Sequence, residues 1–260
     1  MASLFDPKLK LQWAKKHLDA LAVEIAIFKE SNKYRILVRD DQENEWYIIR
    51  FQLPHNDHVF KLALIAGDFI ASLRSSLDHL AWQLALLSAS IPSRHTCFPI
   101  CEEDSPKTQR WITRCTHGIS AGAISIMMSF QPYNSGEAFK ATHLWRLNSL
   151  WNIDKHRHIA PHGVSTDWLF NLNFEQDTQI PMEELDDGGI MRIPIALKDK
   201  VIFNPTPGGV DVFFGDRSER LELSLKDLIE MYEFVATTVI PAFASFFPPE
   251  EYGGFGVIAM

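Results

Sequence analysis

The sequence predicts an α+β fold, and three observations support this prediction. Up to about residue 158, apolar residues recur at steps of three and four, which is the period of amphipathic helices. Over residues 159–223, short segments alternate apolar and polar positions between turns rich in Gly and Pro, as antiparallel strands do. A final periodic segment over about 224–247 predicts a C-terminal helix. No linker or repeat separates these parts, so we expect a single domain over residues 1–260.

The chain begins with a long predicted helix, which is followed by a β-hairpin. Asp6 and Pro7 suit the N-cap and first turn of a helix. The apolar residues that continue this helix at the expected spacing are Leu11, Ala14, Leu18, Leu21, Ile25 and Phe28. The segments KYRILVRD and WYIIRF then alternate on either side of DQENE, which predicts a hairpin over residues 33–52.

Three more helices are expected before the chain changes character. Asn56 or Asp57 can cap a helix that runs to about Ser88. Apolar spacing predicts another helix over residues 106–130 and a further one over residues 137–157. Together with the first helix they would form a helical core.

The C-terminal part is expected to contain short strands and then one helix. The strand candidates are the segments VSTDWLFNLNF, IMRIPIAL, KVIFNP and VDVFFG. Ser224 and Asp227 have the spacing of residues that cap a helix N-terminus. Pro241 is expected to kink or interrupt that last helix, because proline lacks the amide hydrogen that helices use.

Composition and charge restrict the class of protein. With 46% hydrophobic and 22% charged residues, the chain is typical of globular proteins. Its net charge of −8 disfavours a broad surface for nucleic acid, so any contact with RNA should be local. The N-terminus lacks the features of a secretory signal, and no uninterrupted apolar run approaches the roughly 18 residues of a membrane span. We therefore expect a cytoplasmic protein without a membrane partner.

The cysteines raise the question of a metal site. An odd number of cysteines fits a reducing compartment better than a disulfide framework. Zinc accepts all of the Cys and His side chains that lie close together in this region, which are His95, Cys97, Cys101, Cys115 and His117. A spacing of three residues between the first two cysteines is unusual for a closed zinc site, so we favour small buried thiols and expect no cofactor.

The predicted helix at 57–88 bears the first group of candidate functional residues. At about 100° per residue, its leucines share one face and its charged residues share the rest of the circumference. Small residues such as Gly67, Ala71 and Ser75 lie among the polar ones, which favours a second element packed against this arc. The polar candidates on it are Asp68, Arg74, Asp78 and His79.

The helix predicted at 137–157 is the expected neighbour. Asp154 falls on the same stripe as His143 and the apolar positions of this helix. Because a carboxylate on a buried stripe is costly without a partner, we expect it to meet Arg74 or His79. The basic residues at the end of this helix complete the candidate polar centre, and they are Lys155, His156 and Arg157.

Two resemblances involve these residues. The segments GDFIASLRSSLDHLAWQL and LNSLWNIDKHRHI resemble paired signatures of an uncharacterised bacterial protein family, over about residues 10–160. The spacing of Arg74 and His79 also resembles the R-x4-6-H motif of HEPN proteins, many of which are metal-independent ribonucleases and often dimers. This resemblance implies that His79 acts as general base on a ribose hydroxyl, that Arg74 stabilises charge on the phosphate, and that the chain forms a homodimer. Ser75 departs from the motif, which usually has Asn or Asp after the arginine.

Three functions remain open from the sequence. The first is a non-catalytic protein in which the polar centre holds two helices in register, a role that buried ionic groups can take. The second is a HEPN-like endoribonuclease that needs no metal. The third is a module that binds a small ligand or a metal through His79, His143 and Asp154. The first is preferred, because the third lacks a recognisable ligand spacing and the second depends on a short motif.

Overall fold

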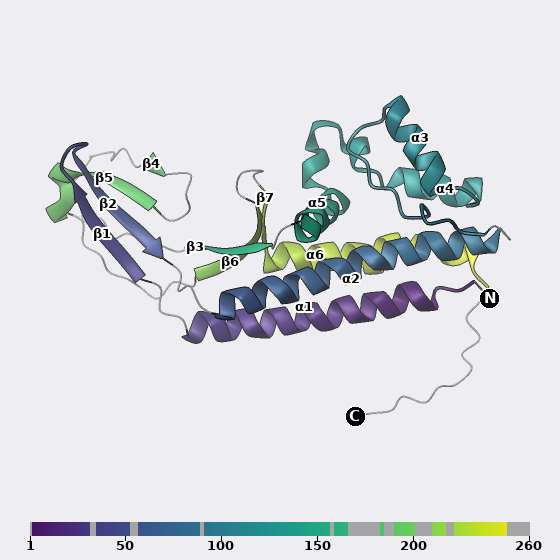
Figure 1. Cartoon of the computed structure of the whole chain (residues 1–260), viewed down its shortest axis with the longest axis horizontal. Helices are drawn as coiled ribbons and strands as arrows, with labels where there is room; N and C mark the ends of the chain where they lie inside the picture. Colours follow the sequence, from purple (N-terminus) through teal and green to yellow (C-terminus); the bar gives the residue numbers. More distant parts are fainter. Residues whose placement is uncertain are drawn as a thin grey trace, which may run out of the picture. The chain divides into compact units, whose positions relative to one another are not determined.

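The computed structural model confirms the α+β class (Figure 1). It describes residues 2–31, 35–52, 57–88, 91–156, 159–165, 183–184, 190–200, 210–216 and 221–248. The chain divides into two compact units, one made of residues 1–18, 67–157 and 228–260, the other of residues 19–66 and 158–227. The single domain expected from the sequence stays a prediction, since two compact units can fold together or separately.

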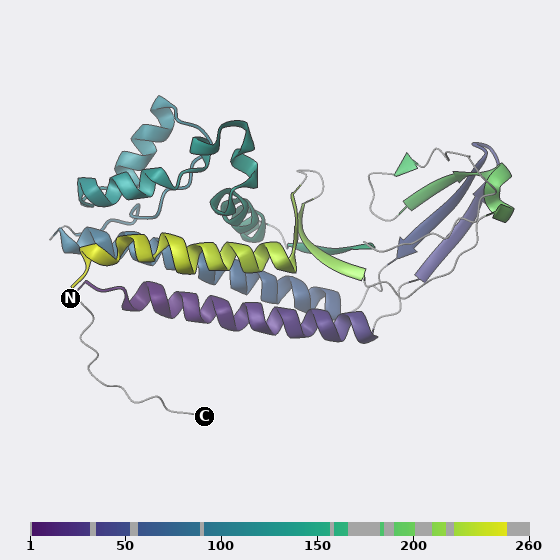
Figure 2. The same ribbon diagram turned by 180° about the vertical axis from the view of Figure 1, so that it is seen from behind.

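The first unit is helical and begins with parts of two long helices, α1 (Phe5–Ser31) and α2 (Asp57–Leu87) (Figure 2). The amide hydrogen of Ser3 bonds to the Gln83 side chain at 3.0 Å, and Gln83 donates to Asp6 at 2.9 Å. The start of α1 is thereby held beside the last turns of α2. The leucines expected on the buried face of α2 are buried, namely Leu73, Leu77, Leu80 and Leu84.

The helix predicted over residues 106–130 is in fact two helices, α3 (Pro106–Cys115) and α4 (Ala121–Ser129). Gly118 interrupts them with a φ of 83°, a left-handed conformation that glycine adopts readily. Ser120 then caps α4 by accepting a hydrogen bond from the Ala123 amide at 3.4 Å. The spacing of apolar residues continued across this break, which is why the sequence predicted one helix.

The helix predicted over residues 137–157 also begins later than expected. Residues Pro132–Ala141 form a 3₁₀ helix, η1, and α5 spans His143–His156. Thr142 has extended backbone angles, and its hydroxyl accepts a hydrogen bond from the Trp145 amide at 3.4 Å. A threonine in this position is a helix N-cap, so the start of α5 is set by a local side-chain bond.

The C-terminal helical segment follows the prediction closely. Helix α6 (Leu225–Phe234) is capped by Ser224 and Asp227, whose side chains bond to each other at 2.6 Å and to each other's amides. A π turn (Val235–Val239) precedes Pro241, and a 3₁₀ helix (Pro241–Phe246) follows it. Pro241 therefore interrupts the regular helix, as expected from its missing amide hydrogen.

The second unit contains two antiparallel sheets, which confirms the strands of the fold class. One has the order β1-β2-β5-β4 and the other the order β3-β6-β7. The predicted hairpin is β1 with β2, in which Ile36 pairs with Phe51. The bounds of the strands are β1 Arg35–Asp41, β2 Trp46–Gln52, β3 Ala160–Ser165, β4 Glu183–Glu184, β5 Ile190–Pro194, β6 Val210–Asp216 and β7 Leu221–Ser224, and a 3₁₀ turn, η2, spans Ile195–Lys200. Most of the predicted segments VSTDWLFNLNF and KVIFNP lies outside the described residues.

One helical stretch, Leu225–Phe246, is long and apolar enough to cross a membrane by length and composition alone. Counting uninterrupted apolar residues missed it, because Glu230 and Glu233 divide the run. Leu228, Met231, Val235 and Val239 of this stretch are buried within the protein. Core helices share this composition, so the stretch gives only weak support for a membrane span and the cytoplasmic location stays a prediction.

Candidate functional site

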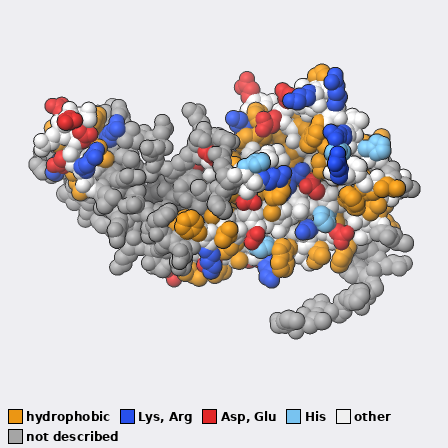
Figure 3. Space-filling view, in the orientation of Figure 1, with side chains coloured by type: hydrophobic (Ala, Val, Ile, Leu, Met, Phe, Trp, Pro, Cys, Tyr) orange, Lys and Arg blue, Asp and Glu red, His pale blue; other side chains and the backbone are white. Residues whose placement is uncertain are grey.

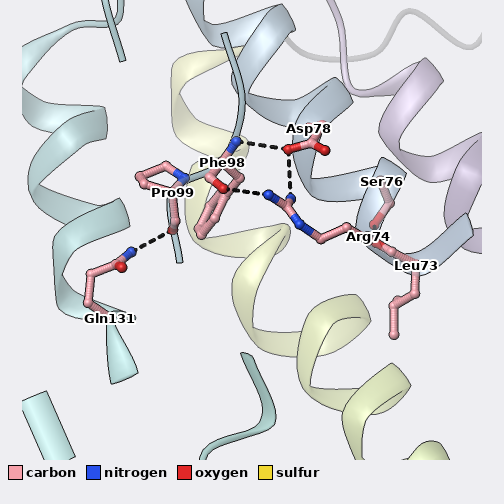
Figure 4. A network of polar contacts seen from close by, with 7 residues as sticks. All are labelled: Leu73, Arg74, Ser76, Asp78, Phe98, Pro99 and Gln131. Carbon is pink, nitrogen blue, oxygen red and sulfur yellow. Dashed lines mark hydrogen bonds and ion pairs between the residues drawn. The ribbon is translucent and has the colours of Figure 1, made fainter. Parts of the chain in front are cut away.

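Arg74 is the central residue of the predicted polar arc, and its side chain is almost completely buried. Only 6% of its surface is exposed. One terminal nitrogen of the guanidinium forms an ion pair with Asp78 Oδ1 at 2.6 Å, one helical turn further along α2. The other terminal nitrogen donates to the backbone carbonyl of Phe98 at 2.9 Å (Figure 4). Both ends of the guanidinium fork are therefore engaged within the chain.

Asp78 also binds Phe98, through the backbone amide. Its Oδ1 accepts a hydrogen bond from the Phe98 amide at 3.0 Å, so Arg74 and Asp78 together bind both backbone polar groups of Phe98 (Figure 4). We call this arrangement the Phe98 clamp. Phe98 lies in a segment, residues 96–101, that belongs to no helix or strand. Since buried backbone groups need partners, the clamp supplies what a neighbouring strand would otherwise provide.

Gln131 acts on the same segment further along. Its side-chain amide donates to the Pro99 carbonyl at 2.8 Å and accepts from the Cys101 amide at 3.0 Å. It also donates to the Met127 carbonyl at 3.0 Å, which links the segment to α4. The Phe98 ring is fully buried and packs edge-on against Phe243. The segment is thus fixed by Arg74 and Asp78 of α2, by Gln131 just after α4, and by its own apolar residues.

The other predicted site residues do not join the clamp. Asp68 is exposed, and His79 is half-buried. His143 packs its ring against Phe234, with the ring centroids 5.1 Å apart, and Lys155 lies over the Trp151 ring at 4.6 Å. His156 is exposed at the end of α5, and Arg157 lies outside the described residues.

Asp154 lies against α2, at Gly67. A Cβ atom built on Gly67 would lie 2.5 Å from Asp154 Oδ1, so the two helices approach closely at the glycine. Arg74, however, makes its ion pair with Asp78, and the contacts between the described residues include none from Asp154 to Arg74 or His79. Arg74 is bound instead by the carboxylate one turn away on its own helix.

Two of the three cysteines are neighbours in the fold. The Cys97 amide donates to the Cys115 carbonyl at 3.4 Å, and the Cys115 thiol lowers the pKa of Cys97. Burial raises the pKa of the Cys101 thiol to about 12. The predicted ligands are all described, and no group of three metal-binding side chains forms among the described residues. His95 instead contacts Arg114, and the His117 side chain is exposed.

Helix α3 presents a cationic face that the sequence reasoning missed. At about 100° per residue, Lys107, Arg110, Trp111 and Arg114 fall within an arc of about 100°. We call these four residues the cationic face. All four are exposed, and Trp111 has 41% of its surface accessible. Figure 3 shows a group of Lys and Arg side chains over α3. The spacing of Lys107, Arg110 and Arg114, at steps of three and four residues, could have predicted this face from the sequence.

No described carboxylate forms an ion pair with the cationic face. Among the described residues, no ion pair involves Lys107, Arg110, Arg114 or the neighbouring Arg94. The acidic residues before the helix have other partners, since Glu103 binds Ser105 and Asp104 binds Gln109. Loss of solvation, together with the charges of Arg114 and Arg94, lowers the pKa of His95. The surface around His95 is therefore strongly positive.

Comparison with known proteins gave no match to a family model, a curated protein or a solved structure. The two family resemblances therefore stay predictions, and the function has to be argued from the site itself.

Proposed function

We propose that the protein is a non-catalytic binding protein, in which the Phe98 clamp is structural and the cationic face of α3 binds single-stranded nucleic acid. The single observation that supports the structural role is the use of both terminal nitrogens of Arg74 by Asp78 and Phe98. A guanidinium that is buried and bound at both terminal nitrogens is poorly placed to contact a phosphate, although its buried Nε has no hydrogen-bond partner among the described residues.

The burial and contacts of Arg74 argue against the ribonuclease alternative. Arg74 would have to contact the reacting phosphate, although it is 6% exposed and bound to the backbone. Residues five apart on a regular helix point about 140° away from each other, so Arg74 and His79 would also need to converge. We therefore prefer the non-catalytic function, which was the leading interpretation of the sequence.

The composition of the cationic face favours a nucleic acid as the ligand. Lys107 lies in the first turn of α3, where the helix dipole disfavours a cation, so helix stability does not account for it. Unpaired Lys and Arg side chains bind phosphates, and an exposed tryptophan beside them offers a ring on which a base can stack. Single-stranded RNA and DNA share this chemistry, and the local RNA contact expected from the sequence is one form of it.

A binding assay with matched charge variants tests the proposal. Fluorescence anisotropy would follow a labelled 15-nucleotide RNA, and the corresponding DNA, at low salt. Replacing Lys107, Arg110 and Arg114 together with Gln should weaken binding about tenfold or more, because three phosphate contacts are lost. The control replaces Lys10, Lys15 and Lys16 of α1 with Gln, which removes the same charge and should change affinity less than about twofold.

Three results would contradict the proposal. If the wild-type protein fails to bind either strand, or if the α1 control loses as much affinity, the cationic face is not a nucleic-acid site. If the wild type cleaves the RNA in the presence of a chelator and His79→Ala does not, the protein is an enzyme of the HEPN type. The melting transition of His79→Ala must match that of the wild type for this comparison to hold.

A further inference from the structure

We infer that Cys97 and Cys115 form a peroxide-sensitive dithiol, which closes to an intramolecular disulfide and leaves Cys101 reduced. This modification site is independent of the function proposed for the cationic face. It rests on the placement of the two thiols, their unequal access to solvent and the charges around them.

The placement suits a disulfide. The backbone hydrogen bond from the Cys97 amide to the Cys115 carbonyl joins the 96–101 segment to the last residue of α3. That bond keeps the two backbones in direct contact, one in an irregular segment and the other at the end of a helix. Disulfides require close backbones of this kind, with Cα separations of about 4.4–6.8 Å. The two thiols also lie near enough for each to shift the pKa of the other.

The two sulfurs have different roles because their surroundings differ. Cys97 is half-buried, whereas Cys115 is buried. The hydrogen bond from the Cys115 thiol, and the charges of Arg74 and Lys155, lower the pKa of Cys97, although burial and Asp78 act in the opposite direction. The same hydrogen bond and burial raise the pKa of Cys115. A reachable thiolate beside a resolving thiol is the arrangement found in peroxide-sensing cysteines.

The reaction balances with hydrogen peroxide as the oxidant. The Cys97 thiolate attacks one peroxide oxygen, an S–O bond forms, the O–O bond breaks, and the leaving oxygen takes up protons as water. The sulfur of Cys115 then attacks the Cys97 sulfur, the S–S bond forms, and the S–O bond breaks. The departing hydroxide leaves as water with the proton of Cys115. Two thiols are oxidised and one hydrogen peroxide is reduced to two waters.

Cys101 provides the internal control. It is buried, and burial and the neighbouring Cys97 and Asp104 raise the pKa of its thiol to about 12. Its backbone is fixed through Gln131, which places its amide in a separate contact from that of Cys97. We therefore expect Cys101 to stay a thiol while the other two cysteines are oxidised.

Peptide mapping of the whole protein tests the inference. The purified protein is treated with a small excess of hydrogen peroxide, its free thiols are alkylated, and it is digested without reduction. We expect a loss of about 2 Da in the intact monomer and a cross-link from Cys97 to Cys115. Trypsin leaves Cys97 and Cys101 on one peptide, because no Lys or Arg separates them. Fragment spectra, and the Cys101→Ser variant, which should form the same cross-link, identify the sulfur involved.

The remaining variants distinguish the roles of the two sulfurs. Cys115→Ser should accumulate a sulfenic acid at Cys97 that a dimedone probe traps, whereas Cys97→Ser should form neither product. The wild-type map decides the matter even if a variant folds poorly. Three alkylated cysteines after peroxide treatment, a cross-link that includes Cys101, or a disulfide between two chains would each overturn the inference.

Discussion

Arg74 and Asp78 form an ion pair, and together they bind both backbone polar groups of a third residue, Phe98. The Phe98 amide nitrogen lies 3.0 Å from the Asp78 carboxylate, and the Phe98 carbonyl oxygen lies 2.9 Å from the Arg74 guanidinium. A buried ion pair adds little net stability by itself, because desolvation offsets the attraction. In this protein, the ion pair instead fixes the position of the 96–101 segment against α2.

Removing the cation should therefore destabilise the protein. Arg74→Met keeps the volume of the side chain but leaves the buried Phe98 carbonyl without a donor. We expect a loss of about 2–3 kcal/mol in the free energy of unfolding, at the lower end of values for broken buried pairs, because Asp78 is partly exposed. Urea denaturation measures this. Asp68→Asn, on the exposed side of the same helix, is the control and should lie within about 0.5 kcal/mol of the wild type. Equal stabilities for Arg74→Met and the wild type would contradict the clamp.

At the residue scale, half of this site can be predicted from the sequence. The spacing of Arg74 and Asp78 places them one turn apart, so their ion pair follows from helix geometry alone. Phe98 could not be predicted as their partner, because it lies in an irregular segment without a period to orient it. The approach of α5 to α2 at Gly67 was predicted, but Arg74 was expected to meet Asp154 and instead binds Asp78, since a helical wheel gives directions but no distances.

At the scale of elements, the contact between α2 and α5 depends on a missing side chain. Gly67 admits Asp154 because a Cβ atom would lie only 2.5 Å from its Oδ1. The same glycine weakens α2, since glycine costs a helix about 1 kcal/mol relative to alanine. Close packing at this crossing and helix stability thus oppose each other.

This opposition predicts a change of sign. Gly67→Ala in the wild type should destabilise the protein by about 1–2 kcal/mol, since the added methyl must displace the Asp154 carboxylate. Made in the background of Asp154→Ala, the same substitution should stabilise it by about 0.5–1 kcal/mol through helix propensity alone. Chemical denaturation of the four proteins in the cycle measures the coupling. If Gly67→Ala has the same effect in both backgrounds, Asp154 does not occupy the space above the glycine.

Helix boundaries were the part of the fold that the sequence predicted least well. Apolar spacing gave the long helices α1 and α2 to within about three residues, because many positions contribute to the period. The break between α3 and α4 depends on the backbone of Gly118 alone, and the start of α5 on the hydroxyl of Thr142. A glycine or a capping hydroxyl can end a helix while the spacing of apolar residues continues, so the apolar pattern did not reveal these boundaries.

At the scale of the whole molecule, charge sets the conditions for binding. The protein has a net charge of −8, which repels polyanions, while the cationic face attracts them over a short range. Binding through about three phosphates predicts a slope of roughly −2 in the logarithm of the association constant against the logarithm of the salt concentration. An affinity insensitive to salt would exclude phosphate contacts as its main source.

The state of His95 predicts that binding also depends on pH. In the free protein, loss of solvation and the charges of Arg114 and Arg94 lower the pKa of His95. A bound phosphate offsets those charges, which raises this pKa in the complex. Because the complex then holds more protons than the free protein, affinity should increase as the pH falls through the range around the ordinary histidine value of about 6.5.

Titrations of the labelled RNA at pH about 7.5 and about 6 measure the effect. His95→Gln should remove most of it, whereas His156→Gln, which replaces an exposed histidine at the end of α5, should retain it. A wild-type affinity that stays constant or falls toward low pH would mean that the ligand does not contact the surface around His95.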